Sequence, residues 1–314
     1  MNALTFAEPP DADPHVRWCE RGSGRPAPST RLYFSCRKHP LSARVYCLTS
    51  RELRLTDQTG PTLDAVSLCL PNGAYTTLRT YHTDRIIGLG AHLQRLIESS
   101  QLLQRPYPID PAAIRSALRD VIARERQPAL RLRLTVPLDV DQVFISVEPF
   151  EVYPLEFYQR GVRCATTRLS RHICPQAKAT NFIAPSRASK AALDPGIHEL
   201  LIVDAPGQIL EGISSNFYAV LKGVLRTAGE GVLEGITRHI VLQEAAEVIP
   251  IDYHPIRVRD LTRVSEAFIT SSSREVMPVI QIDKQIIGAG QPGPITQTLL
   301  EKYRAGLERD AETV

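Results

Sequence analysis

Lysine is scarce in this sequence. Among the 37 basic residues of the 314-residue chain, six are lysines and the others are arginines. If the chemistry of the protein needs a primary amine, few side chains can supply it. The six candidates are Lys38, Lys178, Lys190, Lys222, Lys284 and Lys302.

Paired cysteine motifs and long apolar runs are also lacking. The six cysteines form no Cys-x-x-Cys pair and follow no regular spacing, which argues against a disulfide framework. The first residues lack the apolar core of an export signal, and no apolar run approaches the length of a membrane span. We therefore expect a cytoplasmic protein with reduced thiols, and neither a membrane partner nor a metal site.

Charge is weak and mixed in sign. The net charge is +3, and acidic and basic residues are interspersed, which argues against nucleic acid or an anionic membrane as partner. A hydrophobic content of 43% and a charged content of 23% are typical of globular proteins. The length suffices for two domains of ordinary size.

The pattern of residues divides the chain into four segments. Residues 1–42 are rich in Pro, Arg and Ser without a clear period, and predict an irregular N-terminal extension. Residues 43–148 mix helical and strand patterns and predict a smaller N-terminal α/β domain. Prolines interrupt regular structure in a predicted linker at 149–159, and a larger, strand-rich domain is predicted at 160–314.

Hydrophobic periodicity places the main elements. We predict helices that open near residue 91, around 114–121, at 237–248 and at 295–307. Strand pairs are predicted at 131–136 with 143–147, at 199–203 with 208–210, and at 216–221 with 223–225. Pro206 followed by Gly207 predicts a type II turn between the strands of the second pair.

A first candidate segment for chemistry is Lys178-Ala-Thr-Asn181. A lysine in a polar stretch is ordinarily a solvated surface residue. If Lys178 is instead buried, desolvation lowers its pKa and makes the free amine nucleophilic toward a carbonyl. Lys190 falls in a helical pattern shortly afterwards and is expected at the surface.

A second segment is the run from Gln208 to Asn216, in which Glu211 ends an apolar strand. Gly and small hydroxyl residues follow at once. The carboxylate is either solvated at a hairpin edge or directed at a ring nitrogen of a bound cofactor.

A third segment, Leu233-Glu-Gly-Ile-Thr-Arg238, opens a predicted helix. The first turn of a helix presents unpaired N–H groups and the positive end of the dipole, which suits a phosphate. Gly235 allows a close approach of the backbone. A plain helix cap at Thr237 is the alternative.

The fourth segment is the hydroxyl run Thr270-Ser-Ser-Ser273, which follows a predicted strand. Several hydroxyl donors at a strand end can contact a second side of the same phosphate. A serine-rich loop without a ligand is the alternative.

In this order and spacing, the four segments resemble the class IV aminotransferases. That family includes branched-chain and D-amino acid aminotransferases, (R)-selective amine transaminases and 4-amino-4-deoxychorismate lyase. The resemblance extends from about Leu63 to the C-terminus. It implies pyridoxal 5'-phosphate (PLP) as cofactor and fold type IV, in which a smaller α/β domain precedes a larger strand-rich pseudo-barrel, and it implies a homodimer.

The resemblance also implies roles for individual residues. Lys178 corresponds to the lysine that forms the Schiff base and moves protons, and Glu211 to the partner of the pyridine nitrogen. Arg95 matches the phosphate-binding arginine of the first long helix, although it lies off the apolar stripe and a solvated arginine remains the alternative. The other implied cofactor ligands are Ser214, Ser215, Gly235, Ile236, Thr237, Ser272 and Ser273.

The implied reaction moves an amino group between a small amino acid or amine and a keto acid, through the Lys178 Schiff base. Tyr75 and Arg133 fall where relatives line the substrate pocket, but Thr76 stands where an acidic residue is common. Arg133-Leu-Thr lacks the histidine of the Arg-x-His carboxylate trap of D-amino acid enzymes. Phe182 replaces the tyrosine that contacts the phenolic oxygen of the cofactor in branched-chain enzymes.

Two alternatives stay open at this point. A 4-amino-4-deoxychorismate lyase would use the same cofactor site to eliminate pyruvate, and would form pyruvate without a keto acceptor. A catalytically degenerate PLP-binding homologue is the second alternative. The joint presence of Lys178, Glu211 and Thr237 argues against the degenerate homologue.

Overall fold

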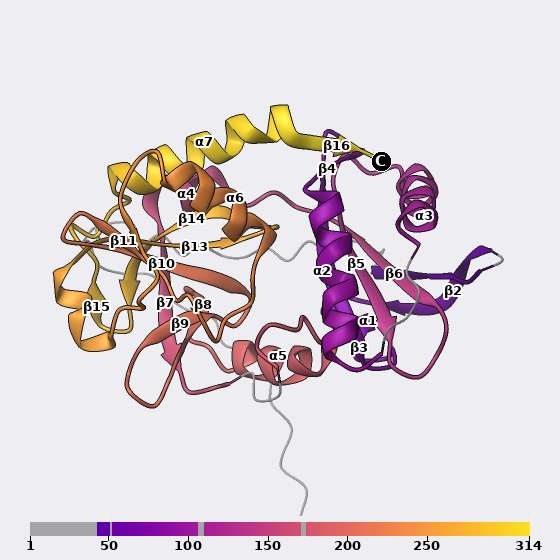
Figure 1. Cartoon of the computed structure of the whole chain (residues 1–314), viewed down its shortest axis with the longest axis horizontal. Coiled ribbons are helices and arrows are strands. Elements are labelled where there is room, and N and C mark those ends of the chain that lie inside the picture. Colours follow the sequence, from indigo (N-terminus) through magenta and orange to yellow (C-terminus); the bar gives the residue numbers. More distant parts are fainter. Residues whose placement is uncertain (1–42, 51, 106–109, 171–173) are drawn as a thin grey trace, which may run out of the picture. The chain divides into compact units, whose positions relative to one another are not determined.

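The computed structural model describes residues 43–50, 52–105, 110–170 and 174–314, and the strands of this part form two sheets (Figure 1). The predicted extension at 1–42 lies outside the described residues. No helix of the described residues is both long and apolar enough to cross a membrane.

The first sheet has seven strands in the order β16-β4-β3-β5-β6-β1-β2, and all neighbours are antiparallel. Its strands are β1 (Ala43–Leu48), β2 (Leu53–Gly60), β3 (Gly73–Tyr81), β4 (Arg85–Ile87), β5 (Leu130–Pro137), β6 (Val143–Pro149) and β16 (Ala311–Thr313). Three helices accompany it: α1 (Leu63–Ser67), α2 (Leu89–Leu102) and α3 (Pro111–Glu125). The predicted pairing of 131–136 with 143–147 is confirmed as β5 with β6.

Helices α2 and α3 pack an apolar side into the first core. On α2, Leu93 and Leu96 are buried as the helical stripe predicts. α3 starts where its sequence directs: the Asp110 side chain accepts a hydrogen bond from the Ala112 N–H, and Pro111 occupies the first turn. The two predicted helices are therefore confirmed, and their inner sides close the core over β3, β5 and β6.

The second sheet has nine strands and closes on itself. β9 pairs with both β8 and β10, so that β10, β13, β14, β7, β8 and β9 form a ring. Its strands are β7 (Val162–Thr167), β8 (Ile197–Val203), β9 (Ile209–Gly212), β10 (Ser215–Leu221), β11 (Val224–Arg226), β12 (Ile251–Asp252), β13 (Val264–Ser271), β14 (Glu275–Ile282) and β15 (Gln285–Ile286). The ring confirms the predicted strand-rich pseudo-barrel.

Helices and 3-10 turns connect these strands. They are α4 (Leu155–Arg160), η1 (Thr180–Phe182), α5 (Ile183–Ala191), α6 (Ile236–Ala245), η2 (Val258–Arg263) and α7 (Pro294–Asp310). The predicted linker contains the start of α4, and only residues 150–154 lie outside helix and strand there. Residues 40–314 group into one compact unit, and this grouping does not test the predicted boundaries within it. Those boundaries stay a prediction.

Of two predicted hairpin turns, the structure confirms one and contradicts the type of the other. Lys222 and Gly223 both have positive φ, as a type I′ turn requires, and join β10 to β11 as predicted. The type II prediction at Pro206 is wrong, because Gly207 N–H donates to the carbonyl of Asp204 and thereby places Pro206 third in the turn. That position needs positive φ in a type II turn, which proline cannot adopt.

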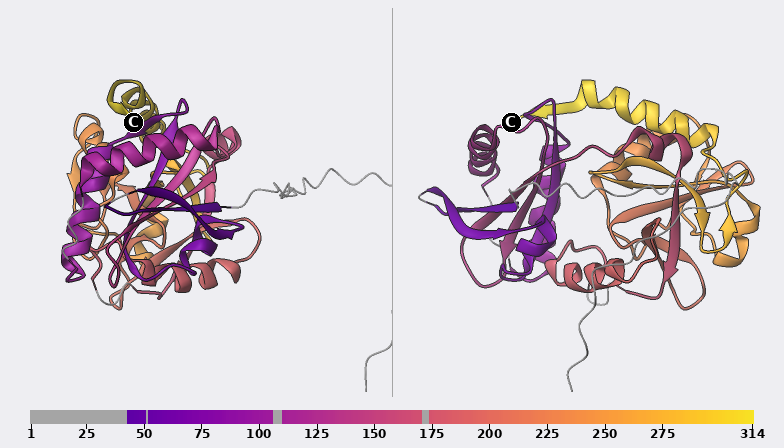
Figure 2. Two further views of the ribbon diagram at one scale, coloured as in Figure 1. Left: turned by 90° about the vertical axis from the view of Figure 1, so that its right-hand side faces the viewer. Right: turned by 180° about the vertical axis from the view of Figure 1, so that it is seen from behind.

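The end of the chain returns to the first sheet. Helix α7 starts against the second core, and β16 then pairs with β4 (Figure 1 and Figure 2). The strand that completes one edge of the first sheet is thus separated from its neighbour by more than two hundred residues of sequence.

A buried ion pair joins the two sheets. Arg79 of β3 lies 3.2 Å from Glu275 at the start of β14, and both side chains are deeply buried, with 6% and 5% exposed. Arg304 of α7 contacts the other carboxylate oxygen at 2.8 Å. Glu275 has a φ of 57°, which is unfavourable for a residue with a side chain, so its two arginine contacts help to hold this backbone conformation.

We expect Glu275→Gln to lower the free energy of unfolding by about 3 kcal/mol, because it leaves the buried Arg79 without a compensating charge. Chemical denaturation measures the change. Glu308→Gln is the matched control, since Glu308 also pairs with an arginine but is 67% exposed, and it should cost less than about 1 kcal/mol. Equal losses in the two variants would contradict this assignment.

Candidate active site

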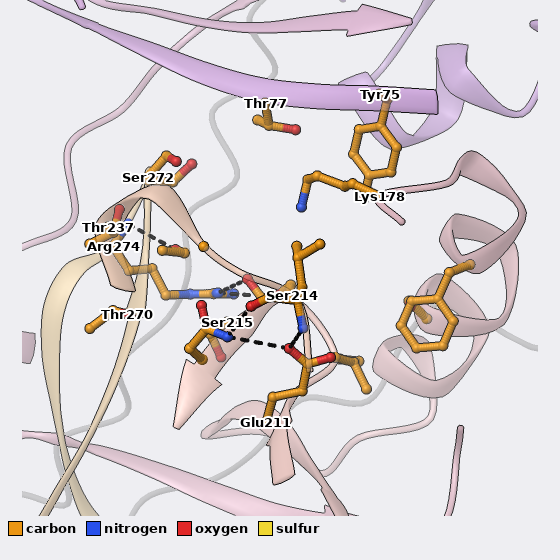
Figure 3. Close-up of a pocket in the computed structure, with 18 of the residues that line it drawn as sticks. Tyr75, Thr77, Lys178, Glu211, Ser214, Ser215, Thr237, Thr270, Ser272 and Arg274 are labelled. Atoms are coloured by element: carbon orange, nitrogen blue, oxygen red, sulfur yellow. Dashed lines mark hydrogen bonds between the residues drawn. The ribbon is translucent and has the colours of Figure 1, made fainter. Parts of the chain in front are cut away.

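Side chains from both sheets line one pocket (Figure 3). Every residue that the sequence singled out for the cofactor or the substrate lies in its wall. From the first sheet and its helices these are Tyr75, Arg95 and Arg133; from the rest of the chain, Lys178, Glu211, Ser214, Ser215, Gly235, Ile236, Thr237, Ser272 and Ser273. The fold thus brings together residues that lie far apart in the sequence.

The backbone of Lys178 is fixed by three hydrogen bonds around it. Lys178 N–H donates to Ser99 Oγ of α2 at 3.1 Å, and Lys178 C=O accepts from Tyr75 N–H of β3 at 2.8 Å. Two residues on, Thr180 Oγ1 accepts from Gly73 N–H at 2.9 Å. The chain therefore runs along the start of β3, and the partly buried Lys178 side chain points into the pocket (Figure 3).

Two cations lie close to the ring of Tyr75. Its ring centroid is 4.9 Å from Lys178 Nζ and 4.9 Å from the guanidinium carbon of Arg133. A cation over an aromatic face is attracted by the quadrupole of the ring. Tyr75 therefore holds the Lys178 amine on one side of the pocket.

Glu211 enters the pocket at the end of β9, and only 2% of it is exposed. Its Oε2 accepts hydrogen bonds from Leu233 N–H at 3.1 Å and from Asn216 Nδ2 at 3.4 Å. Asn216 Nδ2 also donates to the Leu233 carbonyl at 2.8 Å. Hydrogen bonds to the ionised form favour it, so this arrangement suits a carboxylate that must stay charged.

The N-terminus of α6 faces the pocket without a capping side chain. Gly235 is the N-cap residue, and the first turn holds no acidic residue. Thr237 is buried, and its hydroxyl forms no hydrogen bond with any residue that the structure describes. Ser272, just after the end of β13, lies near Thr237 in the same wall (Figure 3). These are donors for an anion.

Arg95 is buried, not solvated, with 8% of it exposed. Its Nη1 donates to the Glu234 carbonyl at 3.2 Å, and its Nη2 to Thr76 Oγ1 at 3.0 Å. Thr76 also lies 2.8 Å from Nδ1 of the buried His92. The threonine that departs from the family pattern thus orients the arginine toward the pocket.

Arg133 lies in the pocket wall, but protein partners occupy most of its guanidinium. Nη1 donates to Leu63 C=O and Ser67 Oγ at 3.2 and 2.7 Å, and Nη2 lies 2.7 Å from Asp64 Oδ1. Burial alone would raise the pKa of Asp64, but Arg133 holds it below its ordinary value. A substrate carboxylate would have to displace an existing carboxylate from this arginine.

Three charged residues of the site were missed in the sequence. Glu199 of β8 is fully buried and lies 3.1 Å from Arg274, which follows the serine run. Lys190, expected at the surface, is partly buried in the pocket wall and donates to Ser214 Oγ at 2.9 Å. A glutamate in front of Leu-Leu-Ile-Val was the one available signal, because an apolar strand seldom carries an unpaired charge.

The donor set fits PLP. An arginine, two or more hydroxyls and an uncapped helix N-terminus converge from separate elements, as a phosphate requires. A lysine amine and a buried carboxylate lie in the same pocket. The amine suits the aldehyde of PLP, and the carboxylate suits its pyridine nitrogen. The residues present therefore suit this cofactor in both charge and chemistry.

Comparisons with known proteins agree with this geometry. The family model for amino-transferase class IV matches residues 73–282. The chain is 26% identical to the branched-chain-amino-acid aminotransferase of Pseudomonas aeruginosa over 259 residues, which cover 74% of the chain and 82% of the relative. It is 28% identical to the D-alanine aminotransferase of Bacillus licheniformis over 243 residues, covering 73% and 85%.

Solved structures are similar in fold. The branched-chain aminotransferase of Thermoproteus uzoniensis with norvaline superposes with a TM-score of 0.70 at 27% identity, covering 86% of this chain and 96% of that one. The branched-chain amino acid aminotransferase of Escherichia coli gives 0.69 at 21%, covering 86% and 96%. A further branched-chain enzyme, solved with pyridoxamine 5'-phosphate, gives 0.72 at 22%, covering 87% and 98%. These likenesses confirm the predicted fold type IV class.

His92 should make the stability of the protein depend on pH. Burial, together with Arg95 and Lys178, holds the pKa of His92 well below its ordinary value. Below about pH 6.5 the unfolded chain therefore binds a proton that the folded chain does not bind. The free energy of unfolding consequently decreases as the pH falls through this range. Relative to His92→Asn, the native protein should lose up to about 1.4 kcal/mol per pH unit. Denaturation at pH values from about 5 to about 8 measures this difference. The exposed His239 gives the control His239→Asn, and a parallel pH dependence in all three proteins would contradict the expectation.

Proposed function

Because the chain belongs to the class IV aminotransferases, a family of PLP-dependent enzymes, we propose that Lys178 binds PLP and carries the proton of the reaction. The enzyme is a transaminase, which moves an amino group between an amino acid and a keto acid. The observation that carries the proposal is the convergence of an amine, a buried carboxylate and several anion donors on one pocket.

Lys178 supplies the amine that holds the cofactor covalently and then acts as acid and base. When bound, PLP accepts the electron pair that is left at the substrate carbon after the proton is removed. The Lys178 Nζ would take that proton from the substrate α-carbon and deliver it to the carbon on the other side of the nitrogen that is transferred. Its backbone hydrogen bonds to Ser99 and Tyr75 keep the amine in place while its covalent link to the cofactor is open.

Glu211 keeps the ring nitrogen of the cofactor protonated. Its carboxylate is buried and already holds two hydrogen bonds from Leu233 and Asn216, which stabilise the ionised form. Ser214 and Ser215 follow directly on the same hairpin, and we assign them to the cofactor ring as well.

The phosphate is held by groups from three elements. Arg95 of α2 provides the positive charge, and the uncapped start of α6 at Gly235, Ile236 and Thr237 provides N–H groups and a hydroxyl. Ser272 and Ser273 approach from the end of β13. This anchorage retains the cofactor when Lys178 is detached from it, because each charge-assisted hydrogen bond is strong in a partly dry pocket.

We also propose that the enzyme is a homodimer in the cytoplasm. The dimer rests on the family resemblance. The location rests on the irregular spacing of the cysteines, of which the four that the structure describes are unpaired. Light scattering of the purified protein tests the dimer directly, and a monomer mass at working concentration would refute it.

Lys178→Ala should abolish the visible absorption band of the lysine-bound cofactor and reduce transamination by at least about 100-fold. The change removes both the covalent anchor and the acid–base group. Lys284→Ala is the control, since Lys284 is an exposed lysine. A native protein that stays colourless after incubation with PLP would refute the proposed function.

Arg95→Met should raise the dissociation constant of PLP about tenfold or more, because a charge-assisted hydrogen bond contributes about 1.5–3 kcal/mol. The change is measured by titrating apoenzyme with PLP and following absorbance. Arg119 is exposed on α3, and Arg119→Met should bind PLP as the native protein does. Unchanged PLP affinity in Arg95→Met would remove Arg95 from the phosphate site.

A further inference from the structure

The pocket carries more positive charge than PLP needs. Seven lysine or arginine side chains line it, against two carboxylates. The cations are Arg95, Arg131, Arg133, Lys178, Arg187, Lys190 and Arg274, and the carboxylates are Asp64 and Glu211. Because charges in a partly buried pocket require compensation, each cation needs a partner or water.

Most of these cations are accounted for. Three arginines have a carboxylate partner: Arg131 with Glu148 at 2.8 Å, Arg133 with Asp64 at 2.7 Å, and Arg274 with Glu199 at 3.1 Å. On the proposed function, Arg95 faces the phosphate and Lys178 binds the cofactor. Arg187 is exposed at the rim, where water solvates it.

Lys190 is the cation that remains. It is partly buried near the C-terminal end of α5, and no carboxylate of the described residues lies within 4.0 Å of its amine. Its one hydrogen bond in this part of the chain goes to Ser214 Oγ at 2.9 Å. An ammonium group has three donors, so two of them are available to a ligand.

Ser214 fixes the direction of Lys190. The Ser214 hydroxyl donates to Glu199 Oε2 at 2.6 Å and accepts from both Lys190 Nζ and Arg274 Nη1, at 2.9 and 3.0 Å. One donor and two acceptor sites exhaust the capacity of a hydroxyl. The serine therefore holds the two cations side by side at the pocket wall, and Figure 3 shows Arg274 extended toward it.

Glu199 stabilises this arrangement from behind. Burial would raise its pKa, but Arg274 and Lys190 hold the pKa of Glu199 below its ordinary value, so the carboxylate stays ionised. It compensates one of the two cations. One positive charge is therefore left over beside Ser214. Ser214 lies on the same hairpin as Glu211, where the cofactor ring is proposed to bind.

We propose that Lys190, aligned by Ser214 and Glu199 with Arg274 beside it, binds the carboxylate of the substrate and selects amino acids over uncharged amines. The inference rests on the proposed function and names the substrate class of the same site. A substrate carboxylate supplies the missing negative charge. Arg133 cannot do so without losing Asp64.

The test compares one amino acid with its carboxamide. From a panel of L-, D- and β-amino acids, the best substrate is chosen by the loss of the visible cofactor band in single-turnover experiments. Lys190→Met should raise the half-saturating concentration of this amino acid about tenfold or more, and leave that of the carboxamide within about twofold. Lys190→Arg keeps the charge and should restore most of the affinity.

A second measurement does not depend on turnover. Valerate carries a carboxylate but no amino group, so it binds without reacting, and calorimetry gives its dissociation constant. Lys190→Met should weaken valerate binding by a factor similar to that found for the amino acid. Arg119→Met is the control, since it removes a charge from the exposed side of α3, outside the pocket lining, and it should change neither value by more than about twofold.

The outcomes separate the two proposals. If the native protein shows no cofactor band, the proposed function fails. Alternatively, the band is present but Lys190→Met has the same half-saturating concentration of the amino acid and the same dissociation constant of valerate as the native protein. In that case Lys190 does not bind the carboxylate. Equal weakening of the amino acid and its carboxamide would also overturn the inference, because the lysine would then act on the shape of the pocket.

Discussion

The site depends on a short backbone contact between β3 and the segment that carries Lys178. Tyr75 N–H donates to Lys178 C=O, and Gly73 N–H donates to Thr180 Oγ1. Gly73 also lets β3 lie close against β5, because an added Cβ would collide with the Val136 backbone. The first sheet thus holds the backbone of the proposed catalytic amine, and the same strand brings the aromatic ring of Tyr75 beside it.

Charge compensation explains the rest of the pocket. Buried charges find partners on different elements: Glu275 joins β14 to Arg79 of β3, whereas Glu199 of β8 holds Arg274. Such pairs add little net stability compared with apolar packing, but breaking one is costly, so they favour a single arrangement of the loops around the site. The loop of Ser272 is bounded in this way by Arg274 and by Glu275.

The sequence predicted the elements well and singled out residues that line one pocket, because both leave local signals. The stripe of α2, the cap at Asp110 and the order of the Lys178, Glu211 and Thr237 segments are patterns of neighbouring residues. Partners distant in the sequence left no such signal. Whether Arg95 is buried depends on Thr76, and whether Lys190 faces the pocket depends on Ser214, so neither could be decided from its own neighbourhood. The type II prediction at Pro206 was wrong for a local reason. The turn begins one residue earlier than expected, so that Pro206 is third in it and not second.

The pairing of β16 with β4 bears on how the protein is made. During synthesis, β3, β4, β5 and β6 leave the ribosome early, but the edge of their sheet beside β4 has no neighbour until residues 311–313 emerge. An unpaired strand edge can join the edge of another chain. The nascent first sheet is therefore open to pairing with other molecules for most of the time of translation, and a chain that stops short of residue 311 keeps that edge open permanently.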